Sequence, residues 1–231
     1  MLNTANRFAR YKTAPLAVCL ALVLAACASH PRTPEETRAN VEAADASLGR
    51  FLRDPDMPSL QKNIAQAKAV MVCPKIFQAG FIVGGSGGRC LVLARKAGAP
   101  GWNGPAAYRI TTGSLGLQAG AQAVEMVALV MTEKAVNSLL SNSFKLGADV
   151  SVAAGPVGSG AGSQINADIV SYVRATGLYG GLNLDGSVIT IDEEGNRGFY
   201  GQPLTPVDIL VKGAHTALGA PLVRTLEGTG G

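Results

Sequence analysis

The chain has 231 residues, of which 47% are hydrophobic and 16% charged, with a formal net charge of +4. This length is enough for one domain with a substantial core. Three of the basic residues (Arg7, Arg10, Lys12) belong to an N-terminal segment without which the charge falls to +1, so the charge balance gives no indication of nucleic-acid binding and we expect no nucleic-acid partner.

Residues 1–26 have the layout of a secretory signal peptide, with basic residues followed by an apolar run from Ala14 to Ala26. The run has 13 residues, whereas a membrane-spanning helix needs about 20. The sequence Leu24-Ala25-Ala26-Cys27 resembles a bacterial lipobox, whose cysteine is acylated after cleavage. We therefore predict a signal peptide over 1–26, lipid on Cys27 and a tether over 27–34. A plain signal peptide, giving a soluble periplasmic protein, is the alternative.

The residue after the acylated cysteine bears on localisation. In Gram-negative lipoproteins a residue other than Asp at this place usually directs export to the outer membrane, and here it is Ala28. By this resemblance we expect an outer-membrane lipoprotein that faces the periplasm and is held to the membrane through acylated Cys27.

Two thiols remain after processing, because Cys19 leaves with the signal peptide and Cys27 carries lipid. In an oxidising compartment Cys73 and Cys90 can form a disulfide, which stabilises by about 3 kcal/mol on the chain-entropy model. The alternative is two separate buried cysteines that act as small hydrophobic residues.

An amphipathic helix is predicted at the start of the domain. Thr33 is a suitable N-cap, Pro34 fits the first helical position, and Glu36 completes a capping box. Apolar residues then fall on one helical face (Val41, Ala44, Leu48, Phe51, Leu52), which is typical of a helix docked on a domain. Prolines 55 and 58 end it, and a short second helix is expected near residues 60–67.

From residue 69 onward the pattern changes to β-rich runs separated by glycine-rich turns. We count about eight: 69–73, 77–85, 89–95, 106–113, 124–131, 148–155, 165–177 and 187–192. Helices are predicted from Thr132 to about Asn142 and over 206–212. The 29 glycines and the short strands favour an α+β fold, a strongly twisted, mainly antiparallel sheet or partial barrel with helices packed on it.

Basic residues are concentrated in one acid-free stretch. Residues 57–124 contain seven basic side chains and no Asp or Glu: Lys62, Lys68, Lys75, Arg89, Arg95, Lys96 and Arg109. Such a block favours an anionic partner on one side of the molecule. The alternative is that folding disperses these charges over a mixed surface.

Several glycine-rich and apolar segments resemble one known family. They are AGFIVGGSGGR (79–89), GWNGPAAY (101–108), SLGLQAGAQ (114–122), VMTEKAVNSLL (130–140) and FKLGADVSVAAGPVG (144–158). In this order they resemble the SYLF domain, with similarity over about residues 65–210, so we expect a single SYLF-like domain over 35–231. The resemblance implies a lipid-binding module. Eukaryotic members bind phosphoinositides through basic residues and an amphipathic N-terminal helix, and some bind actin.

Three motifs invite a catalytic or ligand-binding interpretation. Residues 84–88 match the G-x-S-x-G nucleophile elbow, but a strand rather than a helix is predicted to follow, so a glycine-rich hairpin turn explains them better. Residues 155–162 lack the Lys-Ser/Thr of a phosphate-binding loop. Asp192, Glu193 and Glu194 lack calcium-loop spacing and are predicted to form a solvated turn. We expect no catalytic residues, no metal site and no cofactor.

The sequence therefore predicts a non-enzymatic envelope lipoprotein whose domain binds anionic lipid head groups through the seven basic residues of the acid-free stretch. The alternative is a structural or scaffolding lipoprotein that binds another envelope protein or a polymer.

Overall fold

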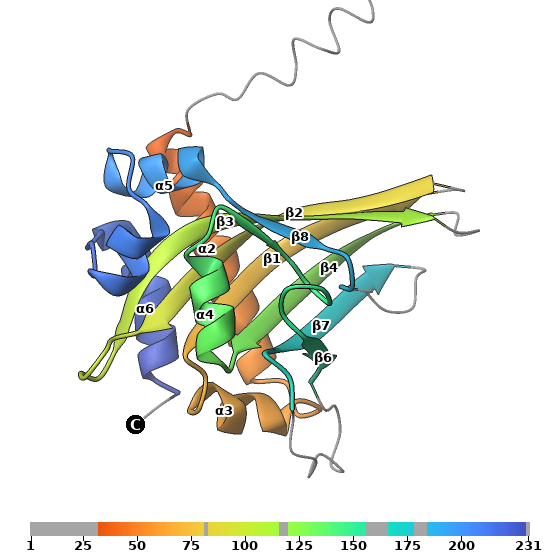
Figure 1. Cartoon of the computed structure of the whole chain (residues 1–231), viewed down its shortest axis with the longest axis horizontal. Helices are drawn as coiled ribbons and strands as arrows, with labels where there is room; N and C mark the ends of the chain where they lie inside the picture. The colour runs from red at the N-terminus through yellow and green to blue at the C-terminus, as the bar shows by residue number, and fades with distance from the viewer. Residues whose placement is uncertain (1–31, 81–82, 116–119, 156–165, 178–183, 230–231) are drawn as a thin grey trace, which may run out of the picture. The chain divides into compact units, whose positions relative to one another are not determined.

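The computed structural model describes residues 32–80, 83–115, 120–155, 166–177 and 184–229, within one compact unit, Arg32–Gly231. Eight strands form one curled sheet: β1 (Ala69–Gly80), β2 (Val83–Arg95), β3 (Trp102–Leu115), β4 (Gly120–Val130), β5 (Ser143–Lys145), β6 (Val152–Ala154), β7 (Ile169–Gly177) and β8 (Val188–Ile191). Their order is β5-β8-β3-β2-β1-β4-β7-β6, and all neighbours are antiparallel except β6 and β7 (Figure 1). The predicted α+β fold is confirmed.

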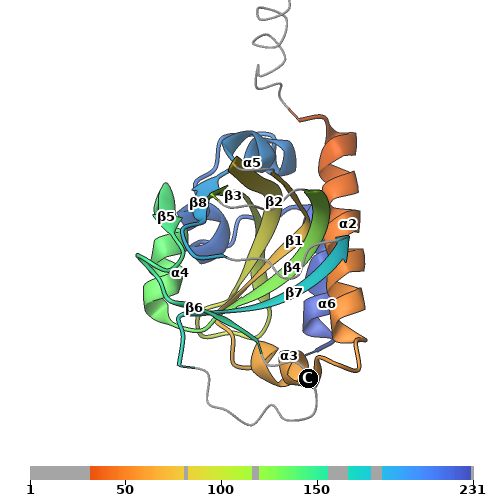
Figure 2. The same ribbon diagram turned by 90° about the vertical axis from the view of Figure 1, so that its right-hand side faces the viewer.

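One face of the sheet is covered by helix α2 (Pro34–Leu52), with α6 (Ala220–Glu227) beside it (Figure 2). The capping box at Thr33 is present as predicted, since its hydroxyl accepts from the amide of Glu36 and the Glu36 carboxylate accepts from the amide of Thr33. The apolar stripe of α2, including Val41, Leu48 and Phe51, is buried against this face. Helix α3 (Pro58–Ile64) follows, and α5 (Glu193–Tyr200) packs beside β3.

The opposite face is covered by α4 (Glu133–Leu139), with β5 next to it (Figure 2), and by the short π-helix η1 (Val207–Val211). A short 3-10 helix, η2 (Ala217–Gly219), precedes α6. Because both faces are covered at one end of the strands, alternate residues enter two cores. In β1, Met71 and Cys73 face α4, whereas Val70 and Val72 face α2. A strand buried on both faces has a continuous apolar sequence, as residues 69–73 do.

At the other end, β1, β2, β3 and β4 stay paired and continue beyond the helices (Figure 1). We call this part the β-arm: residues 77–80 of β1, 83–87 of β2, 111–115 of β3 and 120–123 of β4. It contains no charged residue. The strands stay in register there, with Phe77 opposite Gly87 on β2 and opposite Ala123 on β4.

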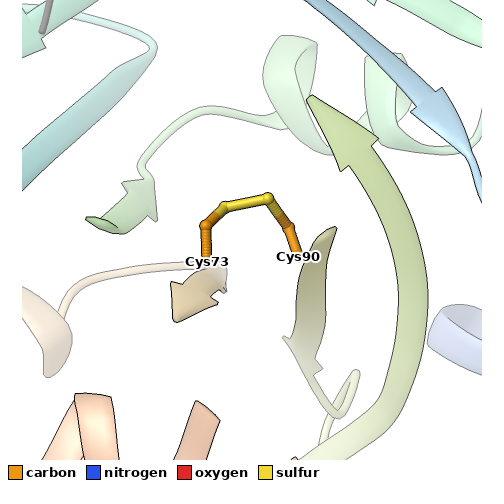
Figure 3. Close-up of a disulfide and its surroundings, with 2 residues drawn as sticks. All are labelled: Cys73 and Cys90. Carbon is orange, nitrogen blue, oxygen red and sulfur yellow. A yellow bond between two sulfur atoms is a disulfide. The ribbon is translucent and has the colours of Figure 1, made fainter. Parts of the chain in front are cut away.

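Cys73 and Cys90 are joined by a disulfide between β1 and β2 (Figure 3). Their Cα atoms are 4.1 Å apart, and both residues are buried on the α4 side of the sheet. Next to the disulfide, β1 contains a bulge at Pro74, where its register with both neighbouring strands shifts. Of the two alternatives from the sequence, the structure contains the disulfide.

Three sequence-based predictions were wrong. The run 77–85, predicted as one strand, is divided between β1, which ends at Gly80, and β2, which begins at Val83. Residues 84–88 form part of strand β2 instead of a hairpin turn, and Gly88 shows why glycine is needed there, because a Cβ would lie 2.6 Å from the carbonyl oxygen of Lys75. The acidic segment 192–194 is no solvated turn, since Asp192 caps α5, a helix that the sequence reading missed. Most of the glycine-rich segment 155–162 lies outside the described residues.

Candidate anion-binding site

Three of the predicted basic residues form a row across three neighbouring strands. Lys75 of β1 pairs in register with Arg89 of β2, which pairs with Arg109 of β3. Directly opposite residues point to the same face, and Arg89 alternates with Leu91, which faces α2. This basic row therefore lies on the α2 side, at the base of the β-arm, and all three residues are exposed.

Like charges directly opposite one another destabilise a sheet, so the row has an energetic cost. It is only partly offset within the protein. The Nζ of Lys75 lies 5.3 Å from the centre of the Phe77 ring, and Arg109 donates to the carboxylate of Asp192 at 3.1 Å. Within the described ranges no carboxylate pairs with Arg89. A bound anion would remove the repulsion that remains.

Asp192 lies at the Arg109 end of the basic row. Its carboxylate is 1% exposed, accepts from the amide of Gly195 at 3.1 Å, and also pairs with Arg32. Burial by itself would raise the pKa of Asp192, but its hydrogen bond to Arg109, the charge of Arg32 and the Gly195 amide together lower this pKa below its usual value.

Arg32 adds a fourth cation beside the row. Burial lowers the pKa of Arg32, the carboxylate of Asp192 opposes this, and the nearby positive charges of Arg89 and Arg109 lower it further. These interactions place the first described residue of the domain next to the basic row.

At the other end of the row, Glu125 of β4 lies across from the bulge next to Lys75 and is held by Arg50 of α2. The local group therefore contains five cations (Arg32, Arg50, Lys75, Arg89, Arg109) and two carboxylates (Asp192, Glu125). Its formal charge is +3 from these residues. The arrangement favours an anion that can accept several charge-assisted hydrogen bonds, such as a phosphate group.

The other four predicted residues do not join the row. Arg95 donates to the carbonyl oxygens of Ile64 and Ala67, both at 2.8 Å, and its guanidinium lies 4.4 Å from the centre of the Trp102 ring, so it holds the end of α3 against the sheet. Lys68 pairs with Glu133 at 2.7 Å. Lys62 on α3 and Lys96 after β2 are exposed.

The predicted group of seven is therefore divided between the two ends of the strands. Arg95 lies six positions after Arg89 along β2, which corresponds to about 20 Å in an extended strand. Sequence reasoning also missed Arg32, Asp192 and Glu125. An Asp followed by two Glu residues is a usable N-cap signal for Asp192, but no local pattern indicates its partner, 160 residues away.

No catalytic arrangement appears among the residues that the structure describes. Ser86 lies within a strand, Asp192 is held by two arginines, and Asp208 bonds to Thr205 and Lys212. In the described ranges no group of three metal-ligating side chains is present. None of the helices in these ranges has the length and apolar character to cross a membrane.

Comparison with known proteins identifies the family. The family model described as "Ysc84: Las17-binding protein actin regulator" matches residues 111–229. Protein YSC84 of Saccharomyces cerevisiae is 32% identical over 186 residues, which cover 77% of this chain and 39% of the yeast protein. The chain belongs to the Ysc84 family, which carries the SYLF domain. The predicted resemblance is confirmed.

Other relatives of this SYLF-domain chain are animal proteins. SH3 domain-containing YSC84-like protein 1 of Xenopus laevis is 33% identical over 144 residues, 60% of this chain and 42% of the relative. The human protein of the same name is 30% identical over 152 residues, 64% of this chain and 44% of the relative. The chain thus matches about two fifths of the length of these curated relatives. The animal relatives are named as SH3 domain-containing proteins, and the family model is described as an actin regulator. No solved structure matches. The basic row precedes the stretch matched by the family model.

Proposed function

We propose that this protein is a non-enzymatic lipoprotein of the bacterial cell envelope whose SYLF domain binds anionic lipid head groups through Lys75, Arg89 and Arg109. Residues 1–26 act as the signal peptide, and Cys27 carries the acyl chains that hold the protein to the outer membrane on its periplasmic side. The lipid proposal rests on the basic row, whose three cations are exposed and lie opposite one another on neighbouring strands. The carboxylate beside the row, that of Asp192, already pairs with arginine.

The chemistry of the row suits a phosphate-bearing head group. Arg89 and Arg109 have planar guanidinium groups that can donate two parallel hydrogen bonds to phosphate oxygens, and Lys75 supplies a more flexible point charge. A Lys or Arg near an anionic membrane surface contributes about 1 kcal/mol. Three such residues would add about 3 kcal/mol to the attachment that the acyl chains provide.

Vesicle flotation of the chain from residue 27 onward, with Cys27→Ser, tests this proposal. We expect the triple variant Lys75→Gln, Arg89→Gln, Arg109→Gln to bind vesicles containing phosphatidylglycerol about 100-fold more weakly than the parent at low salt. Because each charge is screened over about 10 Å at 0.1 M salt, the difference should shrink at high ionic strength.

Two controls belong to this experiment. The variant Lys62→Gln, Lys68→Gln, Lys96→Gln removes predicted cations at the opposite end of the strands and should lower binding much less. Lys145→Gln removes an exposed charge on β5 and should leave binding unchanged. Equal binding by the parent and the basic-row variant at low salt would refute the proposed lipid site.

The lipid anchor is tested separately by mass spectrometry of the protein isolated from bacterial membranes. We expect an N-terminal residue 27 that carries acyl groups. An unmodified mature terminus would contradict the lipoprotein assignment while leaving the basic row as a head-group site.

A scaffolding lipoprotein is the second candidate function. The observation that favours it is the family description, which names a protein, Las17, as the partner of the family's members. This candidate predicts no salt-sensitive binding of the unacylated protein to anionic vesicles, so the flotation experiment separates the two.

A further inference from the structure

The β-arm exposes an aromatic side chain on the same face as the basic row. Phe77 is 54% exposed and Val83 is 68% exposed. Across the strands Phe77 lies opposite Gly87, which has no side chain, and opposite Ala123, which has only a methyl group. Neither residue is large enough to cover the Phe77 ring. The next positions on this face, including Ala79, Gly85 and Ala121, are also small and exposed. The described face around Phe77 is therefore uncharged and consists mainly of small residues.

This apolar surface continues directly into the basic row. Phe77 and Lys75 lie on the same face of β1, and the Lys75 ammonium sits over the ring. Two residues of a strand span about 7 Å. The nearest carboxylates of the local group, Asp192 and Glu125, are each held by arginines. The exposed Phe77 therefore lies two residues further along β1 than Lys75 of the basic row, on the same face.

Arg32, at the start of the domain, lies next to the basic row. Arg32 pairs with the same Asp192 carboxylate as Arg109 does, and it lies five positions after Cys27. Five residues span at most about 17 Å when fully extended. A lipid anchor at Cys27 would thus hold the basic row close to the membrane surface.

We propose that the α2-side face of the β-arm is the surface with which this domain contacts an anionic bilayer. In this arrangement Lys75, Arg89 and Arg109 bind lipid phosphates, and Phe77 enters the boundary between head groups and acyl chains. The inference rests on the proposed lipid-binding function and adds the orientation of the domain on the membrane.

One physical argument limits the depth of this contact. Deeper insertion is opposed by β3, which pairs with β8 only over Tyr108–Thr111 among the described residues. Beyond this point its outer edge carries backbone groups that would have to enter hydrocarbon without hydrogen bonds.

Tryptophan fluorescence tests the contact, with a matched control on the other side of the sheet. Phe77→Trp places a probe on the β-arm, and Val211→Trp places one on η1, where Val211 is 56% exposed. Native Trp102 is buried and provides a constant background. We expect vesicles of phosphatidylglycerol with brominated acyl chains to quench the probe at 77 and to leave the probe at 211 unchanged.

A binding measurement complements the fluorescence. We expect Phe77→Ala to lower the partition coefficient into phosphatidylglycerol vesicles about tenfold, while Val211→Ala leaves it unchanged. Both positions are exposed, so neither variant should disturb folding, and thermal unfolding checks this.

The outcomes distinguish this inference from the proposed function. If the parent binds vesicles and the basic-row variant does not, but the probe at 77 is no more quenched than the probe at 211, head-group binding stands and the β-arm contact is refuted. If the parent does not bind anionic vesicles at all, both proposals fail.

Discussion

The central strands are built differently at their two ends. In β1, residues 69–73 are buried on both faces, whereas Lys75 and Phe77 are exposed on the α2 side only two and four residues beyond Cys73. The disulfide and the bulge at Pro74 mark the boundary. One end of the sheet thus provides the stability that holds the other end, with its cations and small residues, in place. Residues of the β-arm can therefore change with little effect on folding.

The largest expected effect is in the packed end. Leu48 of α2 is 0% exposed and packs on the sheet, so Leu48→Ala should lower the free energy of unfolding by about 2–5 kcal/mol. Phe77→Ala on the β-arm should change it by less than about 1 kcal/mol. Denaturant unfolding measures both. Equal losses would show that the β-arm is packed as firmly as the core.

A slightly smaller effect is expected at the edge of the basic row. Asp192→Asn keeps an acceptor for the α5 cap but leaves Arg32, which is 5% exposed, without its counter-charge, and breaking a buried pair in this way costs about 3 kcal/mol. Because the pKa of Asp192 is lowered on folding, its contribution should be complete above about pH 4 and decline as the pH falls further. The stability gap between the parent and Asp192→Asn should therefore narrow in acid. A gap that is constant with pH would contradict the assigned ion pair.

Removal of the disulfide tests the boundary between the two ends. The cysteines are 17 residues apart, and Cys73→Ala with Cys90→Ala should cost about 3 kcal/mol, measured by thermal unfolding. Alkylation of the unreduced, denatured protein should find neither thiol. Recovery of both thiols would show that the pair is not formed in solution.

The smallest effect is expected from a matched pair of glycines. Gly88→Ala puts a methyl group 2.6 Å from the Lys75 carbonyl oxygen and should destabilise by about 1–3 kcal/mol. Gly113→Ala, on the β-arm, meets no atom within 4 Å and should stay within about 0.5 kcal/mol of the parent. A large loss at Gly113 would mean that the β-arm tolerates substitution no better than the strands at its base.

Local patterns in the sequence were sufficient for much of the fold. The capping box at Thr33 and the apolar stripe after it predicted α2, because both depend on residues within a few positions of one another. Period-two and continuous apolar runs predicted the main strands. The approach failed at residues 84–88 and 192–194, where glycines pair inside a strand and an aspartate caps a helix. The pairing of residues 84–88 depends on distant strands, whereas the Asp192 cap is a local signal, its bond to Gly195, that the sequence analysis did not use.

The sequence by itself determined most of the main elements, the α+β class, the family and the acid-free stretch from which the basic row is drawn. The tertiary structure decided which of the seven cations share a surface. Strand pairing brings Lys75, Arg89 and Arg109 side by side, while Arg95 is used to hold α3. It also brings Arg32 to Asp192 across 160 residues. The reason is that helix caps and apolar periodicity are local, whereas register, bulges and ion pairs depend on how distant segments are aligned in the folded sheet.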